Sequence, residues 1–200
     1  MAPVAFLESS IIYCDDNLHR LAQFPADCVD LIYLDPPFFS NRTYEVIWGD
    51  EAEVRSFEDR WEGGINVYVA WMRERAIEMH RVLKPTGSIY LHCDWHASHY
   101  LKVMMDDIFG RENFLNNVVW CYGLGGSSDR YWPRKHDDLL WYSKKRDSHY
   151  FEADRIPATS QRMKGELKKA PDFWEIPTIN NMAKERLGYP TQKPEALLER

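Results

Sequence analysis

The sequence predicts an α/β fold with a mostly parallel sheet. Short apolar runs bounded by turn residues alternate with two segments in which apolar residues recur every three or four positions. The resulting order of strand, long helix, strand, helix and strand is typical of parallel sheets covered by helices. A chain of 200 residues, 44% of them apolar, is long enough for one substantial core with an inserted lobe.

The first strand and the long helix give the clearest signals. Residues 29–34 form a nearly unbroken apolar run, which is typical of a strand buried on both faces. Asn66 is the expected N-cap of the helix, which residues 84–87, Lys-Pro-Thr-Gly, bring to an end. Spacings of three and four predict one buried stripe on this helix, formed by Val69, Met72, Ala76, Met79 and Leu83.

The remaining elements follow in order. Residues 88–93 predict a second buried strand, and residues 115–121 and 138–143 predict two more. A helix is expected around residues 100–108, ending before Gly110. From residue 151 to 189 the alternation stops, and Pro157, Pro171, Pro177 and the following Pro190 break a polar stretch without a sustained period, so an inserted lobe or a long loop is expected there.

Composition and cysteine usage indicate a soluble cytoplasmic protein that is not associated with a membrane. No uncharged apolar run is long enough to span a bilayer, and the N-terminal MAPVAFLESS lacks the charged start and apolar core of a secretory signal. Cys14, Cys28, Cys93 and Cys121 include no C-x-x-C pair. They are therefore expected to be reduced thiols, belonging to neither a zinc ribbon nor a disulfide framework.

Charge is distributed unevenly along the chain. Residues 1–129 carry 10 Lys and Arg against 20 Asp and Glu, whereas residues 130–169 carry 11 against 6. Aromatic residues are interleaved with the basic ones in the second stretch: Tyr131, Trp132, Trp141, Tyr142, Tyr150 and Phe151. Such a segment suits a phosphate backbone, and a solvated basic face over an aromatic core is the alternative.

The segment Asp35-Pro36-Pro37-Phe38 stands at the end of the first strand, where ligands bind in α/β folds. Each proline fixes φ and removes an N–H, so the segment forms a stiff, extended exit from the strand. It presents a carboxylate and a main-chain carbonyl as fixed acceptors, followed by an aromatic ring. A flat ligand bearing an amino group suits this arrangement, and a rigid turn with a helix-capping Asp is the alternative.

This D-P-P-F segment resembles the catalytic motif of amino-group methyltransferases that act on adenine N6 or cytosine N4 in DNA. Asp15 in the first matching segment stands where the family usually has Gly. With P-T-Q-K-P near the C-terminus, the order of motifs is similar to the permuted β-type, or type III-like, adenine N6 group. Five further segments match in order: residues 12–18, 82–89, 114–120, 135–142 and 189–194, the last containing P-T-Q-K-P.

The resemblance implies a Rossmann-like methyltransferase fold with three parts. They are a catalytic domain at 1–150, an irregular inserted target-recognition region at 151–188, and the start of a cofactor-proximal helix at 189–200. In that family a glycine-rich F-x-G-x-G loop follows P-T-Q-K-P and cradles S-adenosylmethionine. The sequence stops at Arg200, before such a loop, so a fold incomplete at the C-terminus and an incomplete donor site are expected.

The implied activity is that of a site-specific, S-adenosylmethionine-dependent DNA adenine N6-methyltransferase of the kind found in restriction-modification. The Asp35 carboxylate and the Pro36 carbonyl are expected to accept hydrogen bonds from the amine of a flipped base, which stacks on Phe38. The catalytic set is Asp35, Pro36, Pro37 and Phe38. The cofactor-binding set is Asp16, Asn17, Asp35, Thr191 and Lys193, and the DNA-binding set is Phe39, Arg130, Arg134 and Lys135.

Alternatives remain at four points. A cytosine N4 enzyme is the nearest other chemistry, although that group more often has Ser before the two prolines. A truncated chain that binds DNA or a partner subunit without the donor is the non-enzymatic reading. DNA is the expected partner, with a homodimer or a restriction subunit left open, and Asp16 could instead be a helix-capping carboxylate.

One cluster of potential metal ligands does not lead to a predicted metal site. The cluster is His92, Cys93, Asp94, His96 and His99. Strand alternation sends His92 and Cys93 to opposite faces, and the spacing matches no zinc pattern.

Overall fold

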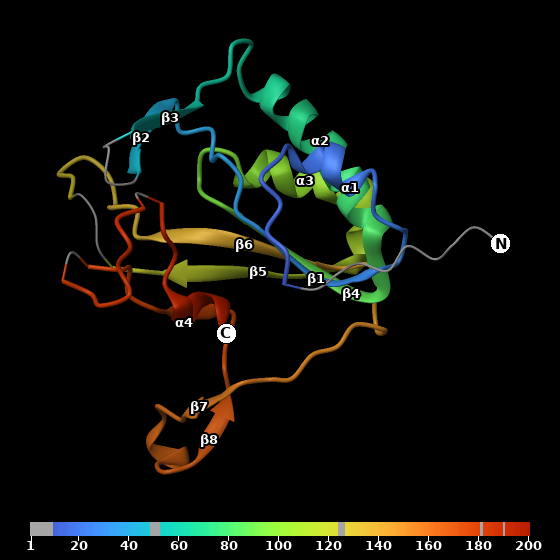
Figure 1. The fold of residues 1–200 in the computed structure, drawn as a ribbon. Helices are drawn as coiled ribbons and strands as arrows, with labels where there is room; N and C mark the ends of the chain where they lie inside the picture. The colour runs from blue at the N-terminus through green and yellow to red at the C-terminus, as the bar shows by residue number, and fades with distance from the viewer. Residues whose placement is uncertain (1–9, 49–52, 124–126, 181, 190) are drawn as a thin grey trace. The chain divides into compact units, whose positions relative to one another are not determined.

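The structure, a computed structural model, describes residues 10–48, 53–123, 127–180, 182–189 and 191–200. The chain forms two compact units. The first unit comprises Met1–Asn41, Asp59–Asn117 and Asp138–Tyr150, and the second comprises Arg42–Glu58, Val118–Asp137 and Phe151–Arg200. The largest sheet has the strand order β1-β4-β6-β5-β9 (Figure 1).

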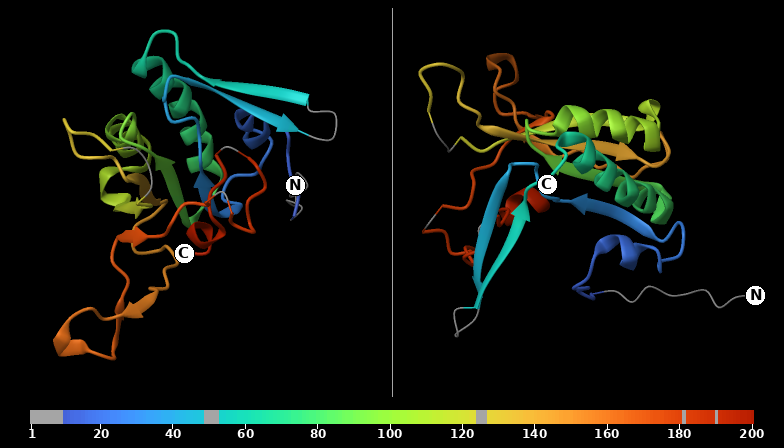
Figure 2. Two further views of the ribbon diagram at one scale, coloured as in Figure 1. Left: turned by 90° about the vertical axis from the view of Figure 1, so that its left-hand side faces the viewer. Right: turned by 90° about the horizontal axis from the view of Figure 1, so that it is seen from above.

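The first unit confirms the predicted α/β alternation. Helices α2 and α3 lie side by side on one face of the sheet (Figures 1 and 2). Its elements are α1 (Asn17–Leu21), β1 (Val29–Leu34), α2 (Ile65–Val82), β4 (Leu83–Cys93), α3 (Ser98–Phe109), the 3-10 turn η1 (Arg111–Asn113), and parts of β5 (Phe114–Cys121) and β6 (His136–Ser143).

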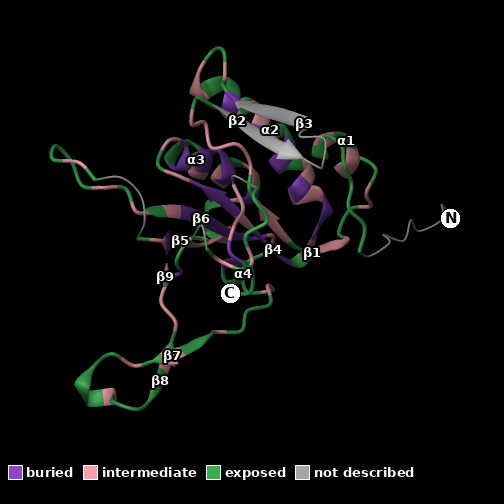
Figure 3. Ribbon diagram, turned by 60° about the vertical axis from the view of Figure 1, so that its left-hand side comes forward, coloured by how far each residue is buried: buried purple, intermediate pink, exposed green. Residues whose placement is uncertain are grey.

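A single buried cluster joins the two helices to the sheet. Most buried positions in Figure 3 lie on α2, α3, β4 and β6. Helix α2 contributes Tyr68, Met72, Ala76 and Met79, and α3 contributes Leu101, Met104, Met105 and Phe109. The predicted helix stripe is therefore largely confirmed, with Tyr68 in place of the partly buried Val69.

The predicted N-cap of α2 is wrong by two residues. The helix begins at Ile65 after Gly64, whose φ of 79° is accessible to a residue without a Cβ. Asn66 lies inside the first turn, and Leu83 is the first residue of β4. The helix does end at Val82, as the Lys-Pro-Thr-Gly signal predicts.

The prediction that β1 is buried on both faces is also wrong. Ile32 and Leu34 pack against the core, whereas Leu31 is 59% exposed. Successive side chains of a strand point to opposite faces, and Ile32 and Leu34 pack against the cluster that α2 and α3 contribute to. The two parallel strands β1 and β4 approach closely at Gly87, where a Cβ would lie 2.9 Å from the Asp30 carbonyl oxygen.

The sheet is mainly parallel and contains one reversed strand. β1 pairs with β4, and β5 with β9, in parallel, while β4 and β6 are antiparallel. Opposite each other on β4 and β6, Tyr90 and Trp141 stack with ring centroids 5.2 Å apart. On the same strand as Trp141, Tyr142 donates a hydrogen bond of 2.7 Å to Asp106 Oδ1 of α3.

The second unit contains short strands that the sequence did not predict between residues 151 and 189. Three-residue strands are too short to show a periodic pattern, which is why they were missed. The Trp120 Nε1–H donates to the Ile176 carbonyl at 2.7 Å, beside the pairing of β5 with β9. The elements are the hairpin of β2 (Arg42–Trp48) and β3 (Glu53–Asp59), the hairpin of β7 (Arg155–Pro157) and β8 (Leu167–Lys169) around η2 (Gln161–Met163), then β9 (Phe173–Glu175) and α4 (Glu195–Leu198).

The predicted three-part division at residues 150 and 188 stays a prediction. In the part of the chain that the structure describes, no helix is long and apolar enough to cross a membrane.

Candidate active site

The site is built where β1 and β4 end side by side. The strands are parallel with Leu34 opposite Leu91, so Asp35 leaves β1 next to His92 of β4. His92 is fully buried, and its Nδ1 lies 2.6 Å from the Tyr33 hydroxyl and 3.7 Å from Asp35 Oδ1. The side chain of Asp35 is 29% exposed. The fold therefore presents a carboxylate to solvent over a buried, hydrogen-bonded imidazole.

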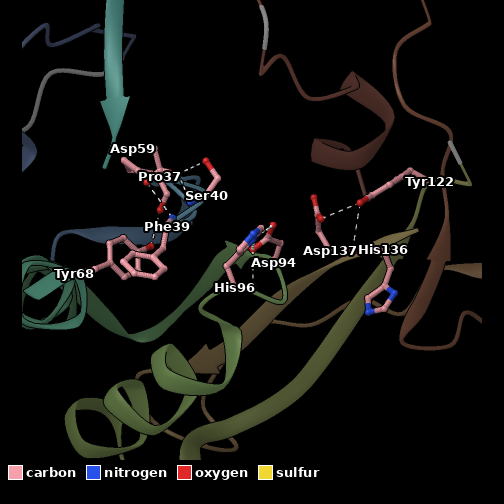
Figure 4. Close-up of polar contacts among 10 residues, drawn as sticks. All are labelled: Pro37, Phe39, Ser40, Asp59, Tyr68, Asp94, His96, Tyr122, His136 and Asp137. Atoms are coloured by element: carbon pink, nitrogen blue, oxygen red, sulfur yellow. Dashed lines mark hydrogen bonds and ion pairs between the residues drawn. The ribbon is translucent and has the colours of Figure 1, made fainter. Parts of the chain in front are cut away.

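The turn after Asp35 is fixed by a hydrogen bond from α2. The Tyr68 hydroxyl donates to the Pro37 carbonyl at 2.6 Å (Figure 4). Tyr68 is fully buried, and burial raises its pKa above the ordinary value, with Cys93, Asp59 and Asp94 acting in the same direction. The hydroxyl therefore stays protonated as a donor, and the second proline has a fixed position.

The two phenylalanines after the prolines point in different directions. The Phe38 ring lies 5.1 Å from the ring of His92, the residue whose Nδ1 is 3.7 Å from Asp35 Oδ1. Phe39 has a φ of 62°, and its ring lies 5.7 Å from that of Tyr68, in the layer packed against the core. The backbone N–H groups of Phe39 and Ser40 donate to the carboxylate of Asp59. Phe38 and the partly exposed carboxylate of Asp35 thus share His92 as a neighbour.

Asp94, just beyond β4, holds His96. The His96 N–H donates to Asp94 Oδ1 at 2.9 Å, and the ring Nδ1 lies 2.8 Å from Asp94 Oδ2 (Figure 4). Across the described ranges, no three His, Cys, Asp or Glu side chains are grouped closely enough to hold a metal ion. Within the described residues, His92, Cys93, Asp94, His96 and His99 therefore do not form a group that could hold a metal ion.

Asp16 caps α1 and pairs with a buried arginine. Its Oδ1 accepts from the Leu18 N–H at 2.8 Å, and its Oδ2 lies 2.6 Å from Arg75 Nη2. The hydrogen bond from Leu18 is the main cause that lowers the pKa of Asp16, with burial opposing and Arg75 adding to it. Arg75 lies over the Trp71 ring, 3.7 Å from its centroid. The capping alternative is thus observed, and the predicted cofactor role of Asp16 and of the exposed Asn17 stays a prediction.

Thr191 and Lys193 belong to the second unit. Lys193 Nζ donates to the Thr191 carbonyl at 3.2 Å. Between them, Gln192 accepts from the Leu187 N–H and donates to the Glu185 carbonyl, at 2.8 and 2.7 Å. These contacts give the P-T-Q-K-P segment a defined local shape, apart from Pro190, which lies outside the described residues.

The predicted DNA-binding residues Arg130, Arg134 and Lys135 lie on a segment of the second unit that leads into β6. Arg130 and Arg134 are exposed, and the Arg134 guanidinium lies 5.1 Å from the centroid of the Tyr131 ring. Trp132 is 92% exposed. At the base of this segment the Tyr122 N–H donates to the Lys135 carbonyl at 3.1 Å, and the Tyr122 hydroxyl donates to Asp137 (Figure 4).

The structure brings together Asp35, Pro36, Pro37 and Phe38, as the motif predicts, and adds three residues that sequence reasoning missed in this role. They are Asp59, Tyr68 and His92, which contact the turn from three different elements. None of the three belongs to a sequence motif that would predict its contact with the turn. The turn as a whole offers fixed acceptors and a nearby aromatic ring to a flat, amine-bearing ligand.

The fold is that of DNA methyltransferases. The structure is similar to that of the PvuII DNA methyltransferase (cytosine-N4-specific), with a TM-score of 0.55 and 17% identity over 86% of this chain and 58% of that one. It is also similar to the M1.HpyAVI–SAM complex, with a TM-score of 0.54 and 17% identity over 94% of this chain and 72% of that one. These likenesses confirm the Rossmann-like methyltransferase fold.

The chain belongs to the DNA methylase family whose N6/N4 methyltransferase model matches residues 29–200. The type II methyltransferase M.HpaI of Haemophilus parainfluenzae is 29% identical over 193 residues, which cover 94% of this chain and 57% of that protein. The DNA adenine methyltransferase YhdJ of Escherichia coli strain K12 is 26% identical, covering 96% of this chain and 66% of that protein. The resemblance drawn from D-P-P-F is thereby confirmed, and the chain spans less than two thirds of either relative.

Proposed function

We propose that this protein transfers a methyl group from S-adenosylmethionine to an exocyclic amino group of DNA, and that the target is adenine N6. The observation that carries the proposal is the partly exposed Asp35 carboxylate at the end of β1, followed by two prolines in a turn that buried side chains hold. Family membership supports a DNA amino group as the acceptor. The name of YhdJ, a DNA adenine methyltransferase, supports adenine.

The chemistry needed at this site is the activation of a weak nucleophile. An exocyclic amine is unreactive because its lone pair is delocalised into the base. Hydrogen bonds from its N–H groups to the Asp35 carboxylate and the Pro36 carbonyl favour a tetrahedral nitrogen and localise that lone pair. As the N–C bond forms and the S–C bond breaks, positive charge develops on the nitrogen beside the carboxylate, which stabilises the transition state more than the ground state. The nitrogen then loses one proton to water, which gives the neutral methylated amine.

Phe38 is the proposed stacking surface for the target base. A base within a duplex is out of reach of a carboxylate held at a strand end, so it has to flip out of the helix. Phe38 lies on the Asp35 side of the turn, next to His92, whereas Phe39 is turned onto Tyr68. Phe38 is therefore the better candidate for stacking on the base, and the predicted DNA contact of Phe39 is the weaker one.

The residues assigned to the methyl donor fit it chemically. S-Adenosylmethionine supplies a methyl group on a sulfonium and carries an adenosine that donates hydrogen bonds. A carboxylate can accept about four hydrogen bonds, and Asp16, whose side chain is 43% exposed, makes one to Leu18 and one ion pair to Arg75. Asp16 can therefore accept a further hydrogen bond from the adenosine of the donor. Motif resemblance assigns four more residues to the donor: Asn17, Asp35, Thr191 and Lys193. A SAM complex is named for M1.HpyAVI, which shares the fold.

Two exposed segments of the second unit are the proposed DNA contacts. In the first, Tyr131 and Trp132 are 60% and 92% exposed and flank Arg130 and Arg134, a combination that suits base stacking and phosphate pairing. The second is the β7–β8 hairpin, whose residues 155–169 carry five Lys and Arg against one Glu. A two-stranded ribbon fits the major groove, so this hairpin is the proposed sequence-reading element of the 151–188 region.

Cytosine N4 is the second candidate target. A fold neighbour, the PvuII enzyme, is named cytosine-N4-specific. The Asp before the two prolines favours adenine instead, because the resemblance associates cytosine N4 enzymes more often with Ser. A homodimer or a restriction subunit as partner stays a prediction.

The test is methylation of unmodified plasmid DNA by the chain with S-adenosylmethionine, followed by digestion and mass spectrometry of the nucleosides. N6-Methyladenine is expected, and it should be absent with Asp35→Ala. N4-Methylcytosine would move the target to cytosine. If no methylated base forms while calorimetry detects no donor binding, the protein is a DNA-binding or partner subunit and the proposed activity is wrong.

A further inference from the structure

A buried carboxylate outside the D-P-P-F motif holds the turn that follows it. Asp59, the last residue of β3, is 1% exposed, and each of its oxygens accepts two hydrogen bonds. Figure 4 shows its contacts with Phe39 and Ser40. Oδ1 accepts from the Phe39 N–H at 3.0 Å and from Trp61 Nε1–H at 2.9 Å. Oδ2 accepts from the Ser40 N–H at 2.6 Å and from the Ser40 hydroxyl at 2.7 Å.

The four donors explain why a charge can be buried at this position. An unpaired buried carboxylate costs several kcal/mol, whereas one with all its acceptor positions used is stable. The donors come from residues that precede β2 and from one that follows β3. Asp59 therefore ties together the two chain segments from which the β2–β3 hairpin departs.

The held segment is strained. Phe39 has a φ of 62°, which bulky L-residues rarely adopt. Each such residue costs about 1–3 kcal/mol and persists only where the surroundings fix it. The carboxylate of Asp59 binds the N–H of Phe39 and of Ser40, which lie at and directly after the strained position. Its hydrogen bonds are thus the contacts that fix this bend.

The bend decides which aromatic ring faces the acceptor site. With Phe39 left-handed, its ring packs on Tyr68, and the Phe38 ring packs on His92, whose Nδ1 lies 3.7 Å from Asp35 Oδ1. We propose that Asp59 is a positioning residue for methyl transfer, because it keeps Phe38 and the two prolines in the geometry that receives the flipped base. This inference rests on the proposed function and assigns it a residue outside the motif.

The variant Asp59→Asn tests the charge with little change of shape. An amide presents one acceptor oxygen and one NH2, so the NH2 faces N–H or O–H donors. The hydrogen bonds that fix the bend on that side are then lost. A shift of about 1 Å in a catalytic group costs about 100-fold in rate. The expected result is a single-turnover methyl-transfer rate about 100-fold below that of the wild type, with the dissociation constant for S-adenosylmethionine within about twofold.

Asp106→Asn is the matched control. Asp106 accepts hydrogen bonds from the Tyr142 hydroxyl and from Lys102, and it joins α3 to β6 away from the turn. It should lower the melting temperature while leaving the transfer rate unchanged. If Asp106→Asn loses as much rate as Asp59→Asn at equal loss of stability, or if Asp59→Asn transfers methyl at the wild-type rate, the positioning role is wrong.

If Asp59→Asn does not fold, Ser40→Ala is the second variant that tests the positioning role of Asp59. It removes one of the four donors and should lower the rate about threefold to tenfold, since one hydrogen bond contributes about 1 kcal/mol. Hydrogen exchange of the Phe39 and Ser40 amides gives a readout independent of activity: faster exchange in Ser40→Ala supports the inference, and unchanged exchange with an unchanged rate overturns it. A wild-type chain that methylates no DNA would instead overturn the proposed function.

Discussion

The turn after β1 and the segment before β6 differ in how their side chains are held. The turn carries Asp35 and Phe38, and hydrogen bonds with the buried residues Asp59 and Tyr68 fix its conformation. The segment at 127–135 carries Arg130, Arg134 and Trp132 with their side chains in solvent. The first region is fixed before any ligand arrives, and the second keeps its charged and aromatic groups hydrated.

The proposed function accounts for this difference, because it assigns a transition state to the turn and a DNA backbone to the segment. Acceptors that stabilise a transition state are effective only if their positions are set in advance, because reorganising them during the reaction costs free energy. Contacts to a phosphate backbone tolerate small errors of position and gain from releasing counterions. Substitutions in the turn should therefore change the rate, and substitutions in the segment should change the affinity for DNA.

The largest expected effect is that of Asp35→Ala. Removing the carboxylate leaves the developing charge on the amine without its acceptor, so methyl transfer should fall about 1000-fold. The affinity for DNA, measured by fluorescence anisotropy with a labelled duplex, should stay within about twofold, because a single small contact is lost.

Asp30→Ala is the control for Asp35→Ala. Asp30 lies on the same strand, is exposed and pairs with Lys84 at 2.8 Å. Its removal should leave both the rate and the affinity unchanged. A loss of DNA affinity in proportion to the loss of rate in Asp35→Ala would show that the turn binds DNA without activating the amine, which would remove the contrast between the two regions.

A smaller effect on the rate is expected from Tyr68→Phe. The variant removes the hydroxyl that donates to the Pro37 carbonyl and should lower the methyl-transfer rate about tenfold and the free energy of unfolding by about 1–2 kcal/mol. Tyr142→Phe removes an equally buried hydroxyl, the one that donates to Asp106. It should lose similar stability and no rate, and equal rate losses in both variants would assign the effect to stability alone.

The complementary prediction concerns Trp132 and Arg130. Trp132→Ala should weaken DNA binding about tenfold through the loss of stacking, with an unchanged single-turnover rate at saturating DNA. Arg130→Ala should reduce the slope of log affinity against log salt by about one unit.

Arg73→Ala is the control for this pair, because Arg73 is a partly exposed arginine whose partner is Asp107. Its slope should equal that of the wild type. A lower rate at saturating DNA in Trp132→Ala would show that the exposed segment takes part in catalysis.

The same contrast explains what the sequence could predict. The strand at 29–34 and the helix ending at Val82 were predictable because local periodicity and turn residues encode them. Asp35, Pro36, Pro37 and Phe38 were found because they are contiguous. The contacts that fix their turn were missed because they join residues far apart in the chain, 20 positions for Asp59 with Phe39 and 31 for Tyr68 with Pro37.

Asp59 illustrates the physical limit of such predictions. It stands in the polar stretch S-F-E-D-R-W, where an aspartate is expected on a solvated surface. Only the fold shows that four donors converge on it. The short strands β7, β8 and β9 were missed for a different reason, since three residues carry no period.

The smallest expected effect is that of Asp16→Asn on stability. Asparagine keeps the cap on α1, so the variant removes mainly the charge that pairs with the buried Arg75. Because the Asp16 side chain is 43% exposed, solvent screens the pair and a loss of about 1 kcal/mol is expected at neutral pH. Asp15→Asn is the control, since Asp15 and its partner Arg20 are both partly exposed.

The lowered pKa of Asp16 predicts how the difference in stability between wild type and Asp16→Asn changes with pH. The folded state lowers the pKa of Asp16 below the ordinary value of 3.8, so the carboxylate stabilises the folded state above pH 3.8. As the pH falls below 3.8 through the lowered pKa, the carboxylate is protonated in the folded state too and the stabilisation is lost. Urea unfolding of wild type and Asp16→Asn should therefore converge as the pH is lowered through this range. A difference that stays constant there would show that the loss comes from shape rather than from charge.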